Sequence, residues 1–146
     1  MNLLAVCHTV VIETRKGKEY YNASSPDELA LVNCAKYYGW EFRGRDESNK
    51  IEIMVGDKKE CYELLNVMEF TSGRKRMSCI VRNPAGQIIL MCKGADSIIL
   101  ERLADSDENK EIVEVTTRYL EGYAKDGLRT LLVGQKELSN EQYAAF

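Results

Sequence analysis

Two short stretches of this chain carry side chains suited to binding a nucleotide. The first runs from Phe70 to Met77 and places an aromatic ring beside three consecutive cations. The second, about twenty residues further on, is centred on Lys93 and Gly94. An aromatic face can stack on a base, and cations can bind phosphates. These residue types therefore indicate a site that holds a nucleotide.

No reactive centre accompanies the two stretches. The sequence has no phosphate-binding glycine loop of the Walker type, no acidic cluster that would hold a metal and no nucleophile next to a base. We therefore expect no catalytic residue and no metal ligand in this chain. The predicted role is to hold a nucleotide for chemistry that takes place elsewhere.

The composition is that of a globular domain. Hydrophobic residues make up 45% of the 146 residues and charged residues 29%, which favours one domain over residues 1–146 with one core. The net charge of -3 argues against nucleic-acid binding, which needs a basic surface. No apolar run approaches the roughly 18 residues that span a bilayer, and we expect a soluble monomer. Five scattered cysteines and one histidine indicate free thiols in a reducing compartment.

The hydrophobic pattern predicts an α+β fold, with an antiparallel sheet flanked by helices. Alternating apolar residues place strands over residues 10–12, 40–42, 51–55, 59–70, 77–82, 87–93 and 128–135. Helices are predicted from residue 26 until Gly39, and over residues 96–104, 111–125 and 139–146. At the first of these, Ser25 is the expected N-cap, and Glu28 three residues later would complete a capping box.

The antiparallel meander brings the two stretches together. The strands on either side of the turn at residues 83–86 pair so that Met77 lies opposite the region of Cys92. Phe70, Met77 and Lys93 should therefore share one end of the sheet. Each residue also has a simpler interpretation: Phe70 as core, Lys93 as a solvated strand end, residues 74–76 as a solvated loop, Glu28 as a helix cap and Arg129 as a surface residue.

Five segments together resemble a known family. Residues 4–10, 21–28, 70–77, 93–97 and 127–131 look like those of the type IV P-type ATPases, the phospholipid flippases. The resemblance covers nearly the whole chain in the right order, and it matches the nucleotide-binding domain, which in that family is inserted into the phosphorylation domain. It implies that residues 1–146 are a single nucleotide-binding domain excised from a larger membrane ATPase.

The resemblance implies a role in nucleotide binding for nine positions. Phe70 would stack on adenine, Lys93 would line the pocket floor and reach toward the base or the phosphates, and Arg129 would engage the phosphates. The remaining six positions would line the pocket: Glu28 at the adenine end, Ser72 and Lys75 at the rim, Met77 near the base, Gly94 where the backbone approaches the ligand, and Thr130 beside Arg129. The family commonly has aspartate at the position of Gly73.

The resemblance also implies what the domain does. It would bind ATP without hydrolysing it, and would present ATP to an aspartate of the phosphorylation domain, which would also supply most of the Mg²⁺ site. In the full-length enzyme, a phospholipid-translocating ATPase, this transfer drives a lipid from the outer to the cytosolic leaflet. The expected partners are the phosphorylation, actuator and transmembrane domains and an accessory subunit, and the expected location is the cytosolic side of an integral membrane protein.

Two other functions remain open from the sequence. Cation-transporting P-type ATPases also pair a phenylalanine with a Lys-Gly-Ala segment, although residues 24–28 and 74–77 favour the lipid branch. The other alternative is a protein-interaction domain that has lost its nucleotide, against which the presence of Phe70, Lys93 and Arg129 argues.

Overall fold

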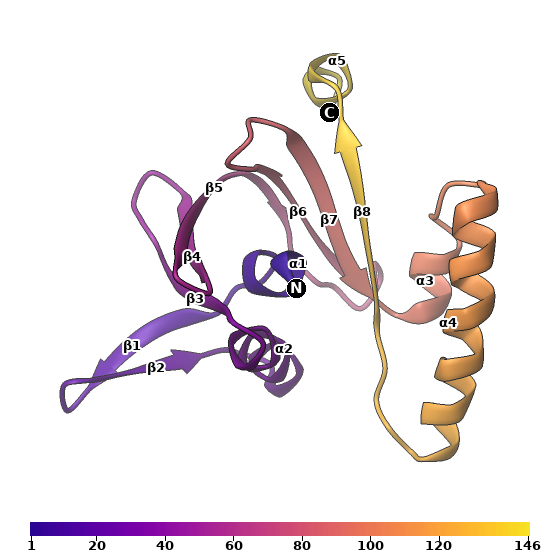
Figure 1. The fold of residues 1–146 in the computed structure, drawn as a ribbon, viewed down its shortest axis with the longest axis horizontal. Coiled ribbons are helices and arrows are strands. Elements are labelled where there is room, and N and C mark those ends of the chain that lie inside the picture. The colour runs from indigo at the N-terminus through magenta and orange to yellow at the C-terminus, as the bar shows by residue number, and fades with distance from the viewer.

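A six-stranded antiparallel sheet organises the computed structural model, which describes residues 1–146 (Figure 1). Each strand pairs with the strand next to it in sequence, so the sheet is a meander, as predicted. Short turns or loops join the strands over residues 40–94, whereas the connection from residue 94 to residue 132, which contains two helices, leads to the last strand. The strands are β3 (Trp40–Arg45), β4 (Lys50–Val55), β5 (Lys58–Met68), β6 (Arg76–Arg82), β7 (Ile88–Gly94) and β8 (Leu132–Leu138).

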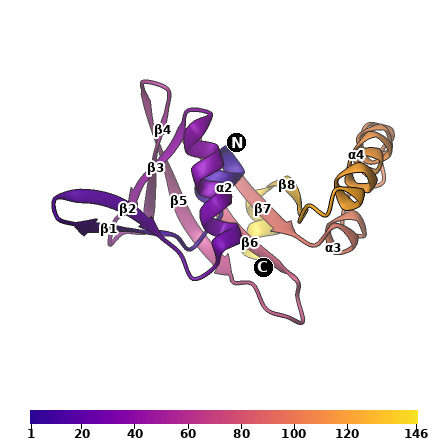
Figure 2. The ribbon, with the colours of Figure 1, turned by 90° about the horizontal axis from the view of Figure 1, so that it is seen from below.

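A separate hairpin and five helices complete the α+β fold. The hairpin, β1 (Val11–Arg15) and β2 (Lys18–Asn22), projects from one end of the molecule, and the long helix α4 stands at the other end beyond β8 (Figures 1 and 2). No helix combines the length and the apolar character needed to cross a membrane. The helices are α1 (Asn2–Val6), α2 (Pro26–Tyr37), α3 (Asp96–Leu100), α4 (Asp107–Lys125) and α5 (Asn140–Ala144).

The main core lies between one face of the sheet and the helices α1 and α2. Ile51 and Ile53 of β4 show why the strand pattern was informative: both side chains are fully buried, whereas Glu52 between them is not. Burying apolar surface in this way stabilises the fold by roughly 25 cal/mol per Å². Helices α1 and α2 contribute Val6, Val32 and Ala35 to the same cluster.

The start of α2 follows the sequence signal only in part. Pro26 occupies the first turn and Ser25 is the N-cap residue, as predicted, but the Ser25 side chain makes no capping hydrogen bond. The predicted capping box is wrong, because the Glu28 carboxylate accepts its hydrogen bonds from Thr9 and Lys93 instead. The Glu28 side chain is therefore used in tertiary contacts and not in capping its own helix.

Several element boundaries differ from the prediction. Strand β8 begins at Leu132 rather than residue 128, α3 ends at Leu100, and α4 begins at Asp107 because the Ser106 hydroxyl accepts from the Asn109 N–H (3.2 Å). The helix α1 was not predicted at all; its five residues are too few for a periodic pattern. Four large apolar residues of α4 are exposed: Ile112, Val115, Tyr119 and Tyr123.

Candidate nucleotide-binding site

A buried ion pair lies at the junction of α2, β7 and the segment after α1. The Lys93 ammonium donates to Glu28 Oε1 (3.3 Å), and both side chains are about nine-tenths buried, with 8% and 10% exposure. Thr9 binds the same carboxylate twice: its N–H donates to Oε1 (3.1 Å) and its hydroxyl to Oε2 (2.7 Å). Every buried side-chain polar atom in the structure has a partner, so this polar cluster is satisfied.

The partners of Glu28 decide its charge. Burial disfavours the carboxylate and would raise the pKa of Glu28, but the hydrogen bond from the Thr9 side chain and the Lys93 ammonium outweigh burial, and the pKa is lowered. Glu28 is therefore ionised at neutral pH. The pair presents a charge-compensated, preorganised ammonium rather than an isolated buried cation.

The register of β6 and β7 places Met77 directly opposite Lys93, which confirms the predicted meeting of these two residues. Met77 is buried, with 4% exposure, and Lys93 has 7%. The interpretation of Lys93 as a solvated strand end is therefore wrong. Lys93 and Met77 together form a buried floor with one ammonium group and one thioether.

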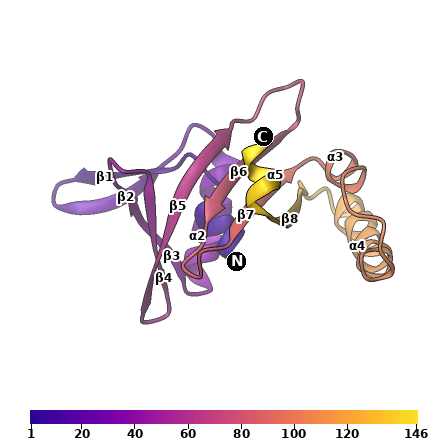
Figure 3. The same cartoon turned by 90° about the horizontal axis from the view of Figure 1, so that it is seen from above.

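The loop between β5 and β6 is held against the end of β7 at Gly94. The Ala95 N–H donates to the Lys75 carbonyl (3.1 Å), and Gly94 pairs with Arg76 in the sheet. A Cβ at position 94 would lie 2.5 Å from the Lys75 oxygen and 2.6 Å from the Arg76 Cβ. Only glycine allows this approach, so Gly94 sets the position of the loop, which extends beyond the strand ends in Figure 3.

The three cations of this loop do not have equal roles. The Arg74 guanidinium donates to the Met68 and Glu69 carbonyls (2.8 and 2.7 Å), and the Arg76 guanidinium donates to the Arg74 carbonyl (3.1 Å). Both arginines therefore stabilise the loop itself. The Lys75 side chain makes no hydrogen bond or ion pair and is exposed, so it is the cation of the three that is free to bind a ligand.

Phe70 and Ser72 are exposed on the same loop. Phe70 is 61% exposed, and the interpretation of this ring as core is therefore wrong. An aromatic side chain of this exposure gains little from burial within the chain. It is available to stack on a flat ligand at the end of the sheet.

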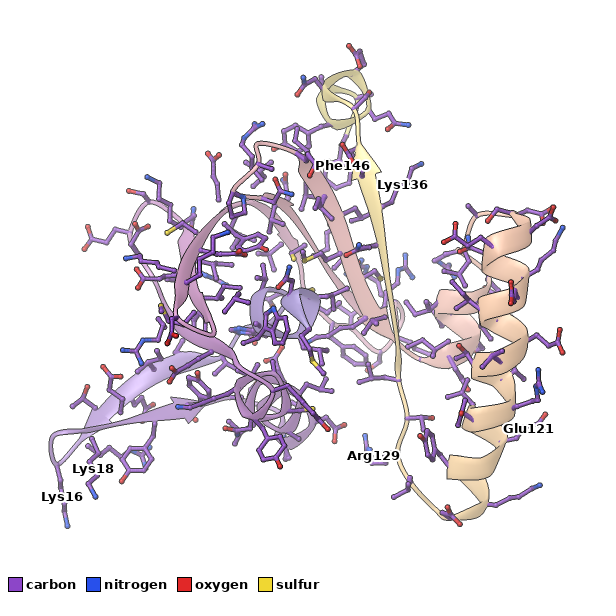
Figure 4. The ribbon with its side chains drawn as sticks, in the orientation of Figure 1. Lys16, Lys18, Glu121, Arg129, Lys136 and Phe146 are labelled. Carbon is purple, nitrogen blue, oxygen red and sulfur yellow. The ribbon has the colours of Figure 1, made fainter.

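Arg129 and Thr130 lie on the segment that leads from α4 into β8. Leu132, two residues after Thr130, pairs with Gly94, which brings this segment to the same end of the sheet. The Arg129 side chain, labelled in Figure 4, is 85% exposed. Its guanidinium donates to the Asp27 carboxylate (2.7 Å) at the start of α2. The structure thus places Arg129 beside the helix turn that carries Glu28.

The structure brings the predicted residues together to different degrees. Glu28, Lys93 and Met77 form the buried floor, Gly94 and Lys75 connect it to the loop with Phe70 and Ser72, and Arg129 is tied to α2 next to Glu28. Phe70 is exposed on the loop, whereas Lys93 is buried in the floor. The residues that the sequence missed are Thr9, His8 and Arg74, although residues 4–10 were one of the five resembling segments.

A surface hollow of about 510 Å³ lies elsewhere, on the β1–β2 hairpin. Its walls are hairpin side chains that are mostly exposed, and no buried polar group points into it. The chemistry described above is concentrated at the other end of α2. We therefore assign the candidate site to the Glu28–Lys93 cluster.

The segment that carries Thr9 is held in place by His8. The His8 ring is buried; its Nδ1 accepts from the Val10 N–H (3.1 Å) and its Nε2 lies 3.0 Å from the Ala5 carbonyl, to which it donates. Its edge packs on Phe42, with ring centroids 4.4 Å apart. Burial lowers the pKa of His8 to about 4, so the ring is neutral in the folded protein.

This neutral histidine predicts a loss of stability in mild acid. The unfolded chain binds a proton on His8 near the ordinary pKa of 6.5, whereas the folded chain resists protonation down to about 4. The unfolded state therefore binds more protons in this window, and the free energy of unfolding should fall by about 2 kcal/mol between about pH 7 and pH 5. Urea unfolding across this range measures the slope.

The control for this prediction is His8→Asn, which keeps an acceptor for the Val10 N–H but does not titrate. The chain has one histidine, so the variant should have a nearly flat stability profile over the same range. An equal slope in both proteins would show that another group causes the pH dependence.

The family model described as P-type ATPase, cytoplasmic domain N, matches residues 1–146. The chain belongs to this family. The β-meander and the cluster of Glu28, Lys93 and Met77 are therefore features of a domain N. The match covers every residue of the candidate site.

Curated relatives of this domain N are named as phospholipid-transporting ATPases. The chain is 48% identical over 147 residues to Phospholipid-transporting ATPase DRS2 of Saccharomyces cerevisiae, covering 98% of this chain and 11% of that protein. It is 46% identical over 149 residues to Probable phospholipid-transporting ATPase 7 of Arabidopsis thaliana (99% and 12%) and 46% identical over 142 residues to Phospholipid-transporting ATPase ID of Homo sapiens (97% and 12%). The chain thus spans about an eighth of the length of these relatives.

The donor set of domain N fits a nucleotide better than a metal ion. P-type ATPases use ATP and Mg²⁺, and the exposed ring, the exposed Lys75 and Arg129 side chains and the buried ammonium all suit ATP. No group of three or more histidine, cysteine, aspartate or glutamate side chains is placed to hold a metal. Oxygen-rich sites are what Mg²⁺ needs, so the residues of this chain do not fit a Mg²⁺ site of their own.

Proposed function

We propose that this domain binds ATP and holds it for phosphoryl transfer to an aspartate in another domain of the parent protein. The observation that carries the proposal is the buried Glu28–Lys93 pair, which lies beside Met77 and next to the loop that exposes Phe70. Positioning of this kind lowers the barrier of a reaction without any bond-making by the domain.

The charge compensation at Lys93 indicates which part of the ligand it meets. An ammonium has three N–H donors, and Glu28 takes one of them. Because Glu28 neutralises the pair, the remaining donors suit a neutral acceptor such as a purine nitrogen better than a polyphosphate. The exposed Lys75 and Arg129 are the cations for the phosphates, with Arg129 exchanging Asp27 for the ligand.

Replacing Phe70 with alanine should weaken ATP binding by about 1–3 kcal/mol, the range for stacking one base on an aromatic ring. The free energy of unfolding should change little, since the ring is 61% exposed. Tyr37→Ala is the matched control, because it removes another exposed aromatic ring, on α2, away from the site. Isothermal calorimetry gives both affinities, and equal affinity in all three proteins would rule out the stacking role.

The proposal as a whole is tested by amide NMR during titration with ATP, first without and then with magnesium. Shifts should gather at residues 70–77, 93–95 and 129–130 and depend little on magnesium. The absence of any shift at millimolar ATP would favour an interaction domain that has lost its nucleotide.

At the level of the parent protein, we propose a phospholipid-translocating ATPase that moves lipid from the outer to the cytosolic leaflet. The names of the relatives support this choice over a cation pump. In that protein the domain would lie on the cytosolic side of the membrane, with the phosphorylation, actuator and transmembrane domains as partners, an accessory subunit bound elsewhere, and Mg²⁺ held mainly by the phosphorylation domain.

The parent activity is tested with the full-length protein in detergent and lipid. ATPase activity that rises with phosphatidylserine supports the lipid transporter. Stimulation by metal ions with indifference to phosphatidylserine would reverse the choice in favour of a cation pump, while leaving ATP binding by this domain intact.

A further inference from the structure

We infer that Thr9 is a positioning residue of the nucleotide site, whose hydroxyl holds the Glu28 carboxylate in the orientation that presents Lys93. The inference rests on the proposed ATP-binding function and adds a residue to it. Thr9 lies outside the nine positions that the sequence assigned to the site. Its contacts reach the ligand only through Glu28 and Lys93.

The geometry leaves Glu28 little freedom. Thr9 contributes one donor to each carboxylate oxygen, at 3.1 Å from its N–H and 2.7 Å from its hydroxyl, and Lys93 shares Oε1 at 3.3 Å. Two donors from one residue to two oxygens fix both the position and the rotation of the carboxylate. Hydrogen bonds to an ionised group are shorter and stronger than those between neutral groups.

Thr9 can act in this way because its own backbone is held on both sides. His8 accepts from the Val10 N–H through Nδ1 and lies 3.0 Å from the Ala5 carbonyl through Nε2. The His8 carbonyl accepts from the Arg45 guanidinium (3.2 Å) of β3. The segment that carries Thr9 is therefore anchored to α1 and to the sheet, and Thr9 transmits that anchoring to Glu28.

Removal of the hydroxyl should loosen the site without removing any charge. Thr9→Val keeps the shape and the backbone N–H but leaves Glu28 Oε2 without its 2.7 Å donor. Hydrogen bonds to the charged form lower a carboxyl pKa, so the variant should raise the pKa of Glu28 above that of the unmodified protein. Thr9→Ser, which keeps the hydroxyl, should restore the value of the unmodified protein.

The experiment is a ¹³C NMR titration of the Glu28 carboxyl carbon in the nucleotide-free domain. The groups facing Glu28 are Lys93 of β7 and Cys7, His8 and Thr9 of the segment after α1. His8 titrates in the same acidic range, and its ring signals, from the one histidine of the chain, report its protonation separately. The titration needs no ATP, so its result stands whether or not the domain binds nucleotide.

A second readout distinguishes positioning from mere folding. ATP affinities of Thr9→Val and the unmodified protein are compared at each pH, because their ratio cancels the titration of ATP itself. The ratio should depart further from one as the pH falls into the range in which Glu28 protonates in the variant but is still ionised in the unmodified protein. Thr9→Ser should show a ratio near one throughout.

Two results would overturn the inference: an unchanged Glu28 pKa in Thr9→Val, or a Thr9→Ser variant that behaves like Thr9→Val. If Thr9→Val does not fold, the link between Thr9 and Glu28 is tested in the unmodified protein. The Thr9 amide proton should then shift with the same midpoint as the Glu28 carboxyl carbon, and separate midpoints would contradict the link. Absence of ATP binding in the unmodified protein, with the Glu28 result as expected, would count against the proposed function alone.

Discussion

Replacing Lys93 with methionine is expected to lower the free energy of unfolding by about 3–5 kcal/mol at neutral pH, because breaking a buried ion pair leaves one charge without its counter-ion. Both partners are about nine-tenths buried here, and methionine keeps most of the apolar volume of the lysine stem. The loss should shrink as the pH falls through the range in which Glu28 protonates, since protonation removes the uncompensated charge. Chemical denaturation at several pH values measures both effects.

A neighbouring ion pair offers a matched control for that prediction. Arg129 pairs with Asp27, the residue before Glu28, at 2.7 Å, but the two side chains are 85% and 50% exposed. Arg129→Met should therefore change the free energy of unfolding by no more than about 1 kcal/mol. Equal losses in the two variants would show that burial does not govern the Glu28–Lys93 pair.

The double variant Glu28→Gln with Lys93→Met separates the unpaired charge from lost packing. The amide can still accept from Thr9, and no uncompensated charge remains. The double variant should therefore be more stable at neutral pH than Lys93→Met alone, and comparison with both single variants gives the coupling between the two sites. A double variant no more stable than Lys93→Met would mean that packing, rather than charge, causes the loss.

The strand pattern was predictable because strict alternation has a single structural meaning when one face is buried. Ile51 and Ile53 are fully buried and Met77 lies opposite Lys93, as the sequence indicates. Where the pattern is ambiguous, tertiary contacts decided. Leu128 was assigned to a strand on hydrophobicity, yet β8 begins only at Leu132, where pairing with Gly94 of β7 begins.

The site was predictable in its residue types but not in its connections. Phe70 and Lys93 could each be recognised as groups suited to a nucleotide, although sequence alone left core and solvent as alternatives. The role of Glu28 was assigned in part to a capping box, because Ser25 stands three residues before it. Nothing local signals that Thr9, nineteen positions away, takes the carboxylate instead, since that contact depends on the packing of the segment after α1 against α2.

Three neighbouring side chains allow this small domain to keep Lys93 buried. Glu28 supplies the opposite charge, Thr9 satisfies the carboxylate, and Met77 packs opposite on β6. Glu28 compensates the buried charge of Lys93, and Thr9 provides the hydrogen bonds that the buried Glu28 carboxylate needs. The ligand then finds its donor already oriented, which reduces the entropy lost on binding.

Gly94→Ala is expected to destabilise the domain by about 3 kcal/mol, at the upper end of the cost of overpacking. The new Cβ would lie 2.5 Å from the Lys75 carbonyl oxygen and 2.8 Å from the Arg76 Cα, and backbone atoms cannot move aside as a flexible side chain can. The strand end and the loop must therefore separate, and the hydrogen bond from the Ala95 N–H to Lys75 (3.1 Å) is lost. Thermal and urea unfolding measure the cost.

The same substitution should also weaken ATP binding, because the displaced loop carries Phe70, Ser72 and Lys75. Gly73→Ala is the matched control: this glycine lies in the same loop, has no positive φ, and a Cβ there would meet nothing within 4 Å. It should leave both stability and affinity close to those of the unmodified protein. If Gly94→Ala lowered stability but left ATP affinity unchanged, the close approach at Gly94 would serve the sheet alone, and the loop would hold its position for the nucleotide by its Arg74 contacts to Met68 and Glu69.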